Sequence, residues 1–414
     1  MATRRTKTAP SATAAHRWEF RARFRPRTFG WKSQPAIARV RQAVAEIKKV
    51  AKKDPVLAAE GAVLFFERVS PALEQVDSSS GAIGSAVSRA IEELVPLIAG
   101  APADATTRNG WLERLFQAHA DDGIPYIERL GDHWGELCAS SEVASAWADR
   151  LIGVTRMALS PDPNLRGHFH GTFACLAALF RAERFAEILD LVRPQALWHY
   201  QRWAVRALAA QGRKAEAIRH AESCRGPYTS DPDVDGLCEQ ILLSEGLVDD
   251  AYARYAVTAN RSATYLGTFR AVAKKYPHKS AAEILADLVK STPGDEGKWF
   301  AAAKDAGHFD EAIRLANSTP CDPKTLARAA RDHAGSEPGF ALEAGLAALD
   351  WLAQGYGYEV TSADVRMAYD HAMRAASTLG RAAELRARVR EITRRYHQGD
   401  SFVARVLGRE LAGA

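Results

Sequence analysis

Apolar residues recur at spacings of three and four along most of the chain, which is the period of one face of an α-helix. Ile37, Val40, Val44 and Ile47 show this spacing first, with charged residues on the other faces. Gly, Pro and Asp-rich turns interrupt the pattern at intervals of roughly 12 to 20 residues. No run of alternating β-branched residues with hairpin turns occurs. The pattern therefore predicts an all-α protein.

A repeated pattern of turns suggests that these helices are paired. In each copy an apolar helix end is followed by a turn residue, three or four further residues, and then Ala beside a large apolar residue. Glycine permits the tight turn, and the small Ala lets the two helices approach closely. The turn residues are Glu183, Gly212, Gly246, Gly307 and Gly380, with a degenerate unit around His278. We expect a right-handed α-solenoid of antiparallel, tetratricopeptide-like helix pairs.

Changes in composition and in the regularity of the repeats suggest four regions. Residues 1–32 are expected to form a flexible basic arm, and 33–160 an irregular N-terminal helical region. Residues 161–320 hold the tetratricopeptide-like repeats, and 321–414 form a C-terminal helical region.

Two further stretches carry a resemblance to a known family. They are residues 72–84, ALEQVDSSSGAIG, and residues 355–360, GYGYEV, which precede an arginine-rich helix pair. Together with the repeats they resemble a group of bacterial tetratricopeptide-like helical-repeat proteins, a form of which is the tail of some SWIM zinc-finger proteins. The likeness spans roughly residues 30 to 410. The zinc finger itself is absent, because no C-x-C pair with a downstream C-x-H occurs.

Positive charge is concentrated at the N-terminus. Residues 1–53 contain 15 Lys and Arg against two acids, whereas the net charge of the whole chain is +5. Between Trp18 and Trp31 arginines alternate with aromatic residues, a pattern that can contact phosphates while stacking on bases. The alternatives are an acidic protein partner, or a solubilising tail whose aromatics pack on the first helix. The candidate nucleic-acid-binding residues are Arg4, Arg5, Lys7, Arg17, Arg21, Arg23, Arg25 and Arg27.

Sequence motifs typical of metal, cofactor or catalytic sites are weak in this chain. His168, His170 and Cys175 form H-x-H-x4-C, but two histidines two residues apart diverge on a helix, so no metal or cofactor is predicted. No catalytic motif stands out, and the chain is expected not to be an enzyme. The five dispersed cysteines include no C-x-x-C pair and suggest a reducing, cytoplasmic location. The longest apolar stretch, near 171–180, is about half of what spans a bilayer, so no membrane association is expected.

The repeats also suggest a binding site. In tetratricopeptide repeats the groove-facing residues lie 13, 10 and 6 positions before the turn glycine, which for Gly212 gives His199, Arg202 and Arg206. The same count in neighbouring units adds His170 and Gln240 as candidates for peptide binding.

Arg202 and Arg206 are four apart and so share one helical face, where two planar guanidinium groups can bind a carboxylate. This arrangement resembles the carboxylate clamp of tetratricopeptide grooves in part, although Asn is usual at the position of Arg206. The alternative is that acids such as Glu187 or Asp190 already pair with these arginines.

The resulting functional expectation is a non-enzymatic scaffold that binds an acidic or carboxylate-bearing peptide in a concave groove. The alternative is a nucleic-acid-associated accessory protein that acts through its basic arm. An enzyme whose site is assembled from distant residues is a third class. The oligomeric state is not predicted.

Overall fold

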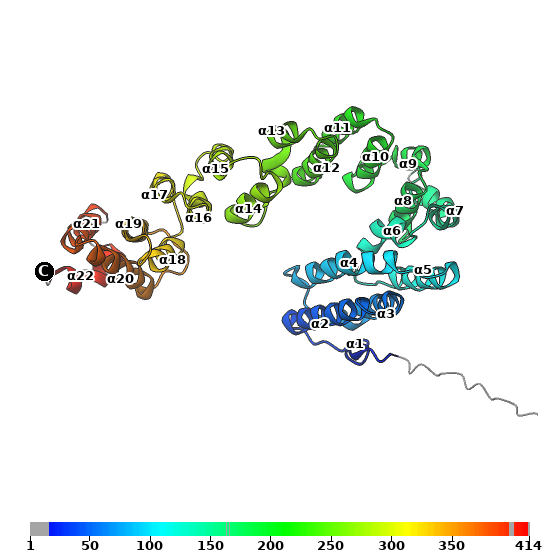
Figure 1. Ribbon diagram of the computed structural model, residues 1–414, viewed down its shortest axis with the longest axis horizontal. Helices are drawn as coiled ribbons and strands as arrows, with labels where there is room; N and C mark the ends of the chain where they lie inside the picture. Colours follow the sequence, from blue (N-terminus) through cyan, green and yellow to red (C-terminus); the bar gives the residue numbers. More distant parts are fainter. Residues whose placement is uncertain (1–15, 163, 165, 397–400, 413–414) are drawn as a thin grey trace, which may run out of the picture. The chain divides into compact units, whose positions relative to one another are not determined.

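The structure is a computed structural model that describes residues 16–162, 164, 166–396 and 401–412. These residues form α-helices and two short 3₁₀ turns, and they contain no β-strand, as the periodicity predicts (Figure 1). The chain divides into two compact units, unit 1 (Met1–Cys224) and unit 2 (Arg225–Ala414). Neither of the region boundaries expected near residues 160 and 320 coincides with this division. No helix among the described residues is long and apolar enough to span a bilayer.

Unit 1 begins with one short helix and continues with longer ones that pack on their neighbours. Its elements are α1 (Glu19–Arg23), α2 (Ser33–Ala51), α3 (Pro55–Leu73), α4 (Ala82–Gly100), α5 (Ala105–Ala120), the 3₁₀ turn η1 (Glu128–His133), α6 (Trp134–Leu137), α7 (Ser141–Ala158), α8 (Thr172–Arg181), α9 (Phe185–Val192), α10 (Trp198–Ala210) and α11 (Lys214–Ser223).

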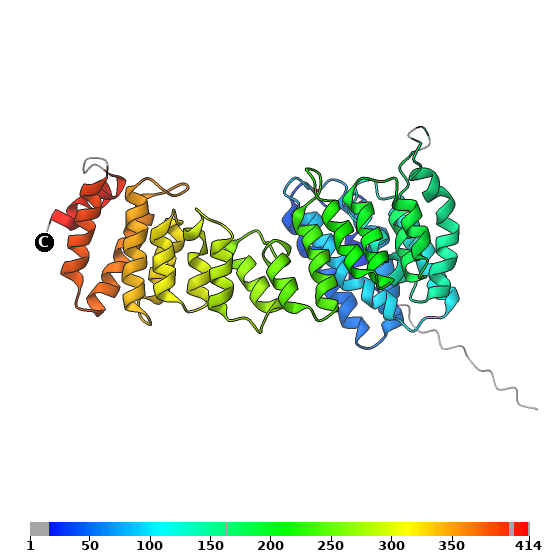
Figure 2. The same cartoon turned by 90° about the horizontal axis from the view of Figure 1, so that it is seen from above.

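The helices of unit 2 stand side by side in a row (Figure 2). They are α12 (Asp231–Ser244), α13 (Val248–Ala259), α14 (Tyr265–Lys275), α15 (Ala281–Lys290), the 3₁₀ turn η2 (Glu296–Trp299), α16 (Phe300–Asp305), α17 (Phe309–Ser318), α18 (Pro323–His333), α19 (Pro338–Ala353), α20 (Ser362–Thr378), α21 (Ala382–Arg395) and α22 (Phe402–Ala412).

Consecutive helices pack in pairs, among them α2 with α3, α10 with α11, α12 with α13 and α16 with α17. The apolar stripes seen in the sequence form the cores of the pairs. Trp111, Trp134 and Trp147 are at most 5% exposed, and Ile37 and Val40 are buried as well. Asp54 accepts a hydrogen bond from the backbone N–H of Leu57 and starts α3 beside Pro55. The first residue of α2 is Ser33, and Lys32 before it is the capping residue.

The predicted turn residues adopt a left-handed backbone conformation. The φ angle is +78° at Gly212, +75° at Gly246, +76° at Gly307 and +72° at Gly380. The backbone N–H of Arg213 donates to the carbonyl of Leu208, and that of Gly212 donates to Ala209. This pair of bonds is a Schellman motif, which satisfies the last carbonyls of a helix. The same bonds recur at the other three glycines.

Glu183 is the exception that tests this pattern. Its φ angle is +58°, and its turn makes the same two hydrogen bonds, from Arg184 to Leu179 and from Glu183 to Phe180. A side chain with a Cβ atom is strained in this conformation, by roughly 1–2 kcal/mol. We therefore predict that Glu183→Gly raises the free energy of unfolding by about 1 kcal/mol, measured by urea denaturation.

Gly212→Ala is the matched control for this prediction, because it introduces a Cβ at the equivalent turn, where open space surrounds the glycine. It should lower the stability by about 1 kcal/mol. A loss of stability in Glu183→Gly would contradict the prediction.

The N-terminal segment differs from the flexible arm expected for residues 1–32. Trp18, Phe20 and Phe24 are 6%, 2% and 1% exposed, and α1 packs on α2 and α3. The Trp18 indole lies on Gly61, where an added Cβ would come within 2.2 Å of the ring. Residues 16–32 are therefore part of unit 1, as the alternative of aromatics packed on the first helix predicts. Residues 1–15 lie outside the described residues.

Candidate functional site

A pocket of about 1080 Å³ lies within unit 1 and contains both arginines of the predicted clamp. The C-terminal part of α4, the segment from η1 to α6, the end of α8 and one face of α10 form its walls. Its charged lining residues are Arg129, Asp132, His133, Glu136, Arg181, Glu183, Arg202 and Arg206. The sequence places Arg202 and Arg206 here because they are four residues apart on α10, where Trp203 and Leu208 are buried.

Arg206 has an unusual environment for an arginine. Its guanidinium carbon lies 4.4 Å from the centre of the Trp203 ring and 4.8 Å from that of Phe180. It forms no hydrogen bond or ion pair with any other described residue. Burial, and then the nearby charge of Arg202, lower its pKa from the ordinary arginine value. A partly desolvated cation without a counterion is costly, so an anion in this pocket would be stabilised.

Arg202 is held more firmly than Arg206. Its Nη2 donates to Oδ1 of Asp132 at 2.5 Å, and its Nε donates to the backbone carbonyl of His199 at 3.1 Å. Asp132 belongs to η1, 70 residues earlier in the chain. Arg202 therefore connects α10 to η1, while the donors of Arg206 have no partner among the described residues.

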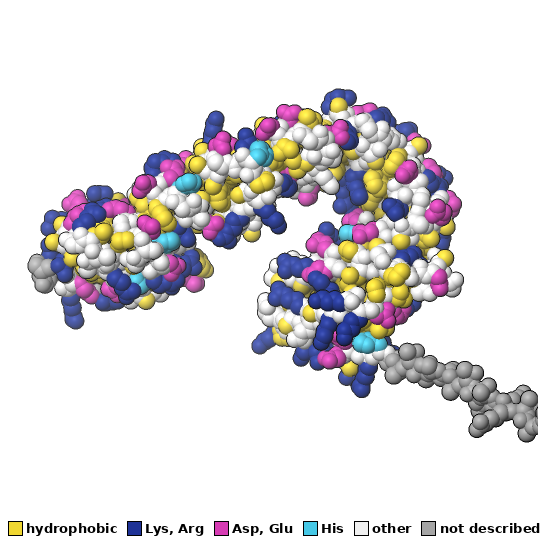
Figure 3. Space-filling view, in the orientation of Figure 1, with side chains coloured by type: hydrophobic (Ala, Val, Ile, Leu, Met, Phe, Trp, Pro, Cys, Tyr) yellow, Lys and Arg dark blue, Asp and Glu magenta, His cyan; other side chains and the backbone are white. Residues whose placement is uncertain are grey.

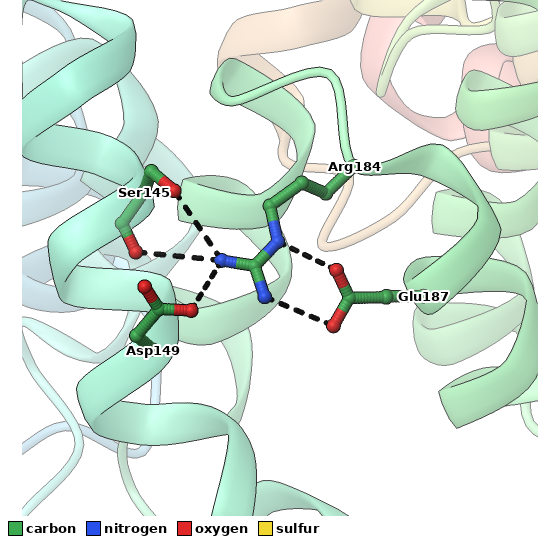
Figure 4. A network of polar contacts seen from close by, with 4 residues as sticks. All are labelled: Ser145, Asp149, Arg184 and Glu187. Atoms are coloured by element: carbon green, nitrogen blue, oxygen red, sulfur yellow. Dashed lines mark hydrogen bonds and ion pairs between the residues drawn. The ribbon is translucent and has the colours of Figure 1, made fainter.

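Arg184, at the start of α9, shows how a structural arginine of this unit is satisfied (Figure 4). It makes two bonds to Glu187, at 2.6 and 3.0 Å, and one to Asp149 at 2.6 Å. Ser145 accepts two longer bonds from the same guanidinium. Glu187 is thus occupied by Arg184, and Asp190 pairs with Arg193 at 2.6 Å. The two acids proposed as partners for the clamp have other partners, and Arg206 has no acidic partner among the described residues.

The other arginines of the pocket also have partners. Arg129 pairs with Glu92 at 3.5 Å, and Arg181 donates to the backbone carbonyl of Ala139 at 2.7 Å. Trp203 is 1% exposed, and its indole Nε1 has no hydrogen-bond partner among the described residues. The pocket therefore offers the guanidinium of Arg206, which is unpaired among the described residues, beside the aromatic rings of Trp203 and Phe180.

The remaining candidates for peptide binding lie elsewhere. His199 does not line the pocket; its ring packs on Tyr200 and Phe173, and its carbonyl orients Arg202. His170 lies in the turn before α8, exposed, with its ring 4.5 Å from that of His168. Gln240 is exposed on α12 and belongs to unit 2.

The candidate nucleic-acid residues divide into three groups. Arg4, Arg5 and Lys7 lie outside the described residues. Arg17 and Arg21 are exposed on the surface of unit 1. The others make local contacts: Arg23 with Glu19, Arg25 with the carbonyl of Ala22, and Arg27 with both carboxylate oxygens of Glu74.

The aromatic residues that would stack on bases are largely buried, so they are not available for that role. Trp31, at 71% exposed, is the exception among the aromatic residues of 18–31.

Sequence reasoning missed the residues that shape the pocket around the arginines. Asp132, Phe180 and Trp203 were not among the predicted site residues. The two aromatic residues had a signal in the sequence: Trp203 lies one turn before Arg206 on α10, and Phe180 lies near the end of α8. A comparison with protein-family models and with curated proteins finds no match, so the geometry carries the functional argument.

Proposed function

We propose that this chain is a non-enzymatic binding scaffold, and that the pocket around Arg206 binds a carboxylate of an acidic peptide. The observation that carries the proposal is the unpaired guanidinium of Arg206, beside Trp203 and Phe180, in a pocket of about 1080 Å³. A carboxylate can accept two parallel hydrogen bonds from a guanidinium, which suits this planar donor better than a point charge would.

The size and walls of the pocket support a peptide ligand. Small-molecule pockets generally measure about 300–1000 Å³, so this one has room for a peptide end of several residues. The aromatic walls and Ala177 offer apolar contact to neighbouring side chains of the ligand. The charged lining consists of four arginines and His133 against the acids Asp132, Glu136 and Glu183. The guanidinium groups would then fix the position and direction of the bound peptide.

The finer description of the fold belongs to the same proposal. We propose that the helix pairs are tetratricopeptide-like and right-handed, and that the protein is related to the bacterial helical-repeat proteins it resembles. The recurring Schellman turns at Gly212, Gly246 and Gly307 support the repeated pairing. A cytoplasmic location is part of the proposal and agrees with the buried free thiols of Cys138, Cys175 and Cys321.

Fluorescence anisotropy with short peptides tests this function. The probe is a labelled library of peptides of about six residues that end in Asp or Glu, each made with a free and with an amidated C-terminus. We predict that Arg206→Gln weakens binding by about 10- to 100-fold, because a charge-assisted hydrogen bond contributes about 1.5–3 kcal/mol. The melting temperature should stay nearly constant, because Arg206 has no ion pair among the described residues to lose.

Two controls sharpen the result. Arg219→Gln removes the same charge from an exposed site on α11 that does not line the pocket, and it should change affinity less than twofold. Arg206→Lys keeps the charge but loses the planar pair of donors, so its affinity should lie between those of the wild type and Arg206→Gln. Full affinity in Arg206→Gln would contradict the proposal, as would the absence of binding by every peptide in the library.

A further inference from the structure

A second hollow surface of unit 1 lies between α2 and α4, which pack side by side. This groove has a volume of about 610 Å³. The residues that line it come from one face of each helix and include five cations, Arg41, Lys48, Lys49, Lys52 and Arg89. Figure 3 shows Lys and Arg side chains gathered over this end of unit 1. The groove is separate from the Arg206 pocket, since the two share no lining residue.

Most of these cations have no counterion. Lys48 pairs with Glu93 at 2.7 Å, whereas Arg41, Lys49, Lys52 and Arg89 form no ion pair with any described residue. All four are exposed.

The one acid of α2 does not offset their charge. The carboxylate of Glu46 accepts hydrogen bonds from the backbone N–H groups of Glu19 and Phe20, at 2.7 and 3.1 Å, on the α1 side of the helix. Glu46 therefore leaves the groove side of α2 unneutralised, and among the described residues only Lys48 there has an acidic partner, Glu93 of α4.

The floor of the groove is apolar. Ile37, Val40 and Val44 contribute to it from α2, and Ala82 and Ala86 from α4. The α4 side chains are small, so another helix could approach the backbone closely there. An apolar floor between cationic edges is the complement of an amphipathic helix with an apolar face and acidic flanks, bound in the helix-in-groove mode.

We propose that the α2–α4 groove docks an acidic amphipathic helix of a partner protein. Charge complementarity carries the choice of partner, because four unpaired cations lie along an apolar floor. A nucleic-acid backbone has no apolar face for this floor, and the lining contains no aromatic residue on which a base could stack. The chain's own residues 1–15 contain Arg4, Arg5 and Lys7 and no acid, so their charge opposes binding in the groove.

The test uses a model peptide of about 18 residues, close to the length of α2. It is acetylated, amidated and fluorescently labelled, with Leu and Ala on one face and Glu on both flanks. A scrambled peptide of the same composition and a single-stranded DNA of similar charge are the comparison probes. We expect the full chain to bind the helix at least about tenfold more tightly than the scrambled peptide, and more weakly as salt rises.

Matched charge reversals then locate the binding surface. The groove variant combines Arg41→Glu, Lys52→Glu and Arg89→Glu, and should weaken helix binding at least about tenfold. The control variant combines Arg21→Glu, Arg39→Glu and Lys53→Glu, which are exposed and outside the groove, and should change it less than about threefold. Thermal melting checks that both variants remain folded.

Two further variants separate this proposal from its alternatives. Ala86→Gln fills the floor without changing the charge, so it should weaken helix binding at least about fivefold and leave any DNA binding unchanged. Arg206→Gln should leave helix binding unchanged, because the amidated peptide docks away from that pocket. The proposal is overturned if the scrambled peptide or the DNA binds the wild type as tightly as the helix does. It is also overturned if both charge variants weaken binding equally, or if the helix does not bind.

Discussion

Gly135→Ala should lower the free energy of unfolding by about 2–3 kcal/mol and weaken peptide binding at the Arg206 pocket. Gly135 lies on α6 at its crossing with α8, and an added Cβ would lie 2.3 Å from the backbone carbonyl oxygen of Ala177 and 2.8 Å from Cβ of Arg181. Overpacking of a tight contact generally costs about 1–3 kcal/mol, and a backbone atom cannot turn aside as a side chain can. The displacement of α6 would also move η1, which holds the Asp132 partner of Arg202.

Gly153→Ala is the matched control for this substitution. Gly153 lies in α7, is exposed, and has no atom within 4 Å of an added Cβ. Alanine in a helix interior is favoured over glycine by up to about 1 kcal/mol, so this variant should be slightly more stable than the wild type. Urea unfolding followed by circular dichroism compares the two. Equal stabilities would show that the α6–α8 crossing relaxes without cost.

Glu239→Ala should destabilise the protein by about 3 kcal/mol. Glu239 is 1% exposed on α12, and its carboxylate accepts hydrogen bonds from the Tyr276 hydroxyl at 2.6 Å, the Asn260 amide at 2.7 Å and Lys275 at 2.6 Å. These partners come from the ends of α13 and α14, so one carboxylate connects three successive helices. Removal of one partner from a buried, charged network costs about 3–5 kcal/mol. Lys275 can turn to solvent when Glu239 is removed, so the expected loss of stability lies at the lower end of this range.

Two comparison variants test whether the network causes this loss. Glu391→Ala removes an acid that is 62% exposed on α21, and it should change the stability by less than about 0.5 kcal/mol. Tyr276→Phe removes one donor and leaves the other two in place, so its cost should be about 1 kcal/mol. Urea unfolding followed by tryptophan fluorescence provides the measurement. A Glu239→Ala variant as stable as Glu391→Ala would contradict the prediction.

The candidate site was predictable in part. Arg202 and Arg206 were placed on one face of a helix because the helical period depends only on local sequence, and both line the same pocket. Their partners were not predictable. Glu187 and Asp190 were candidates because they are near in sequence, yet Glu187 pairs with Arg184, and Asp132 reaches Arg202 from 70 residues away. Which acid meets which arginine depends on how helices cross, and that information is absent from the spacing along the chain.

The N-terminal segment likewise shows that local sequence leaves open which side chains become buried. The sequence indicates a basic segment with interleaved aromatics, but Trp18, Phe20 and Phe24 could have faced either solvent or a core. The structure buries these three and leaves cations exposed along α2, where they border the groove with α4. Burial of aromatic surface favours this outcome at about 25 cal/mol per Å². The exposed positive charge that borders this groove therefore belongs to the folded unit.

The sequence by itself determined the helices and their turns, because these depend on interactions within a few residues. A period of three and four specified the buried faces, and the repeat pattern placed Glu183 at a turn, where the structure has a left-handed backbone. Only the tertiary structure decided which charges are neutralised and which stay free. Arg184 and Arg206 are both arginines of the same repeat region, yet one has three carboxylate bonds and the other has none among the described residues. That difference arises from long-range helix packing, which brings acids to one guanidinium and aromatic rings to the other.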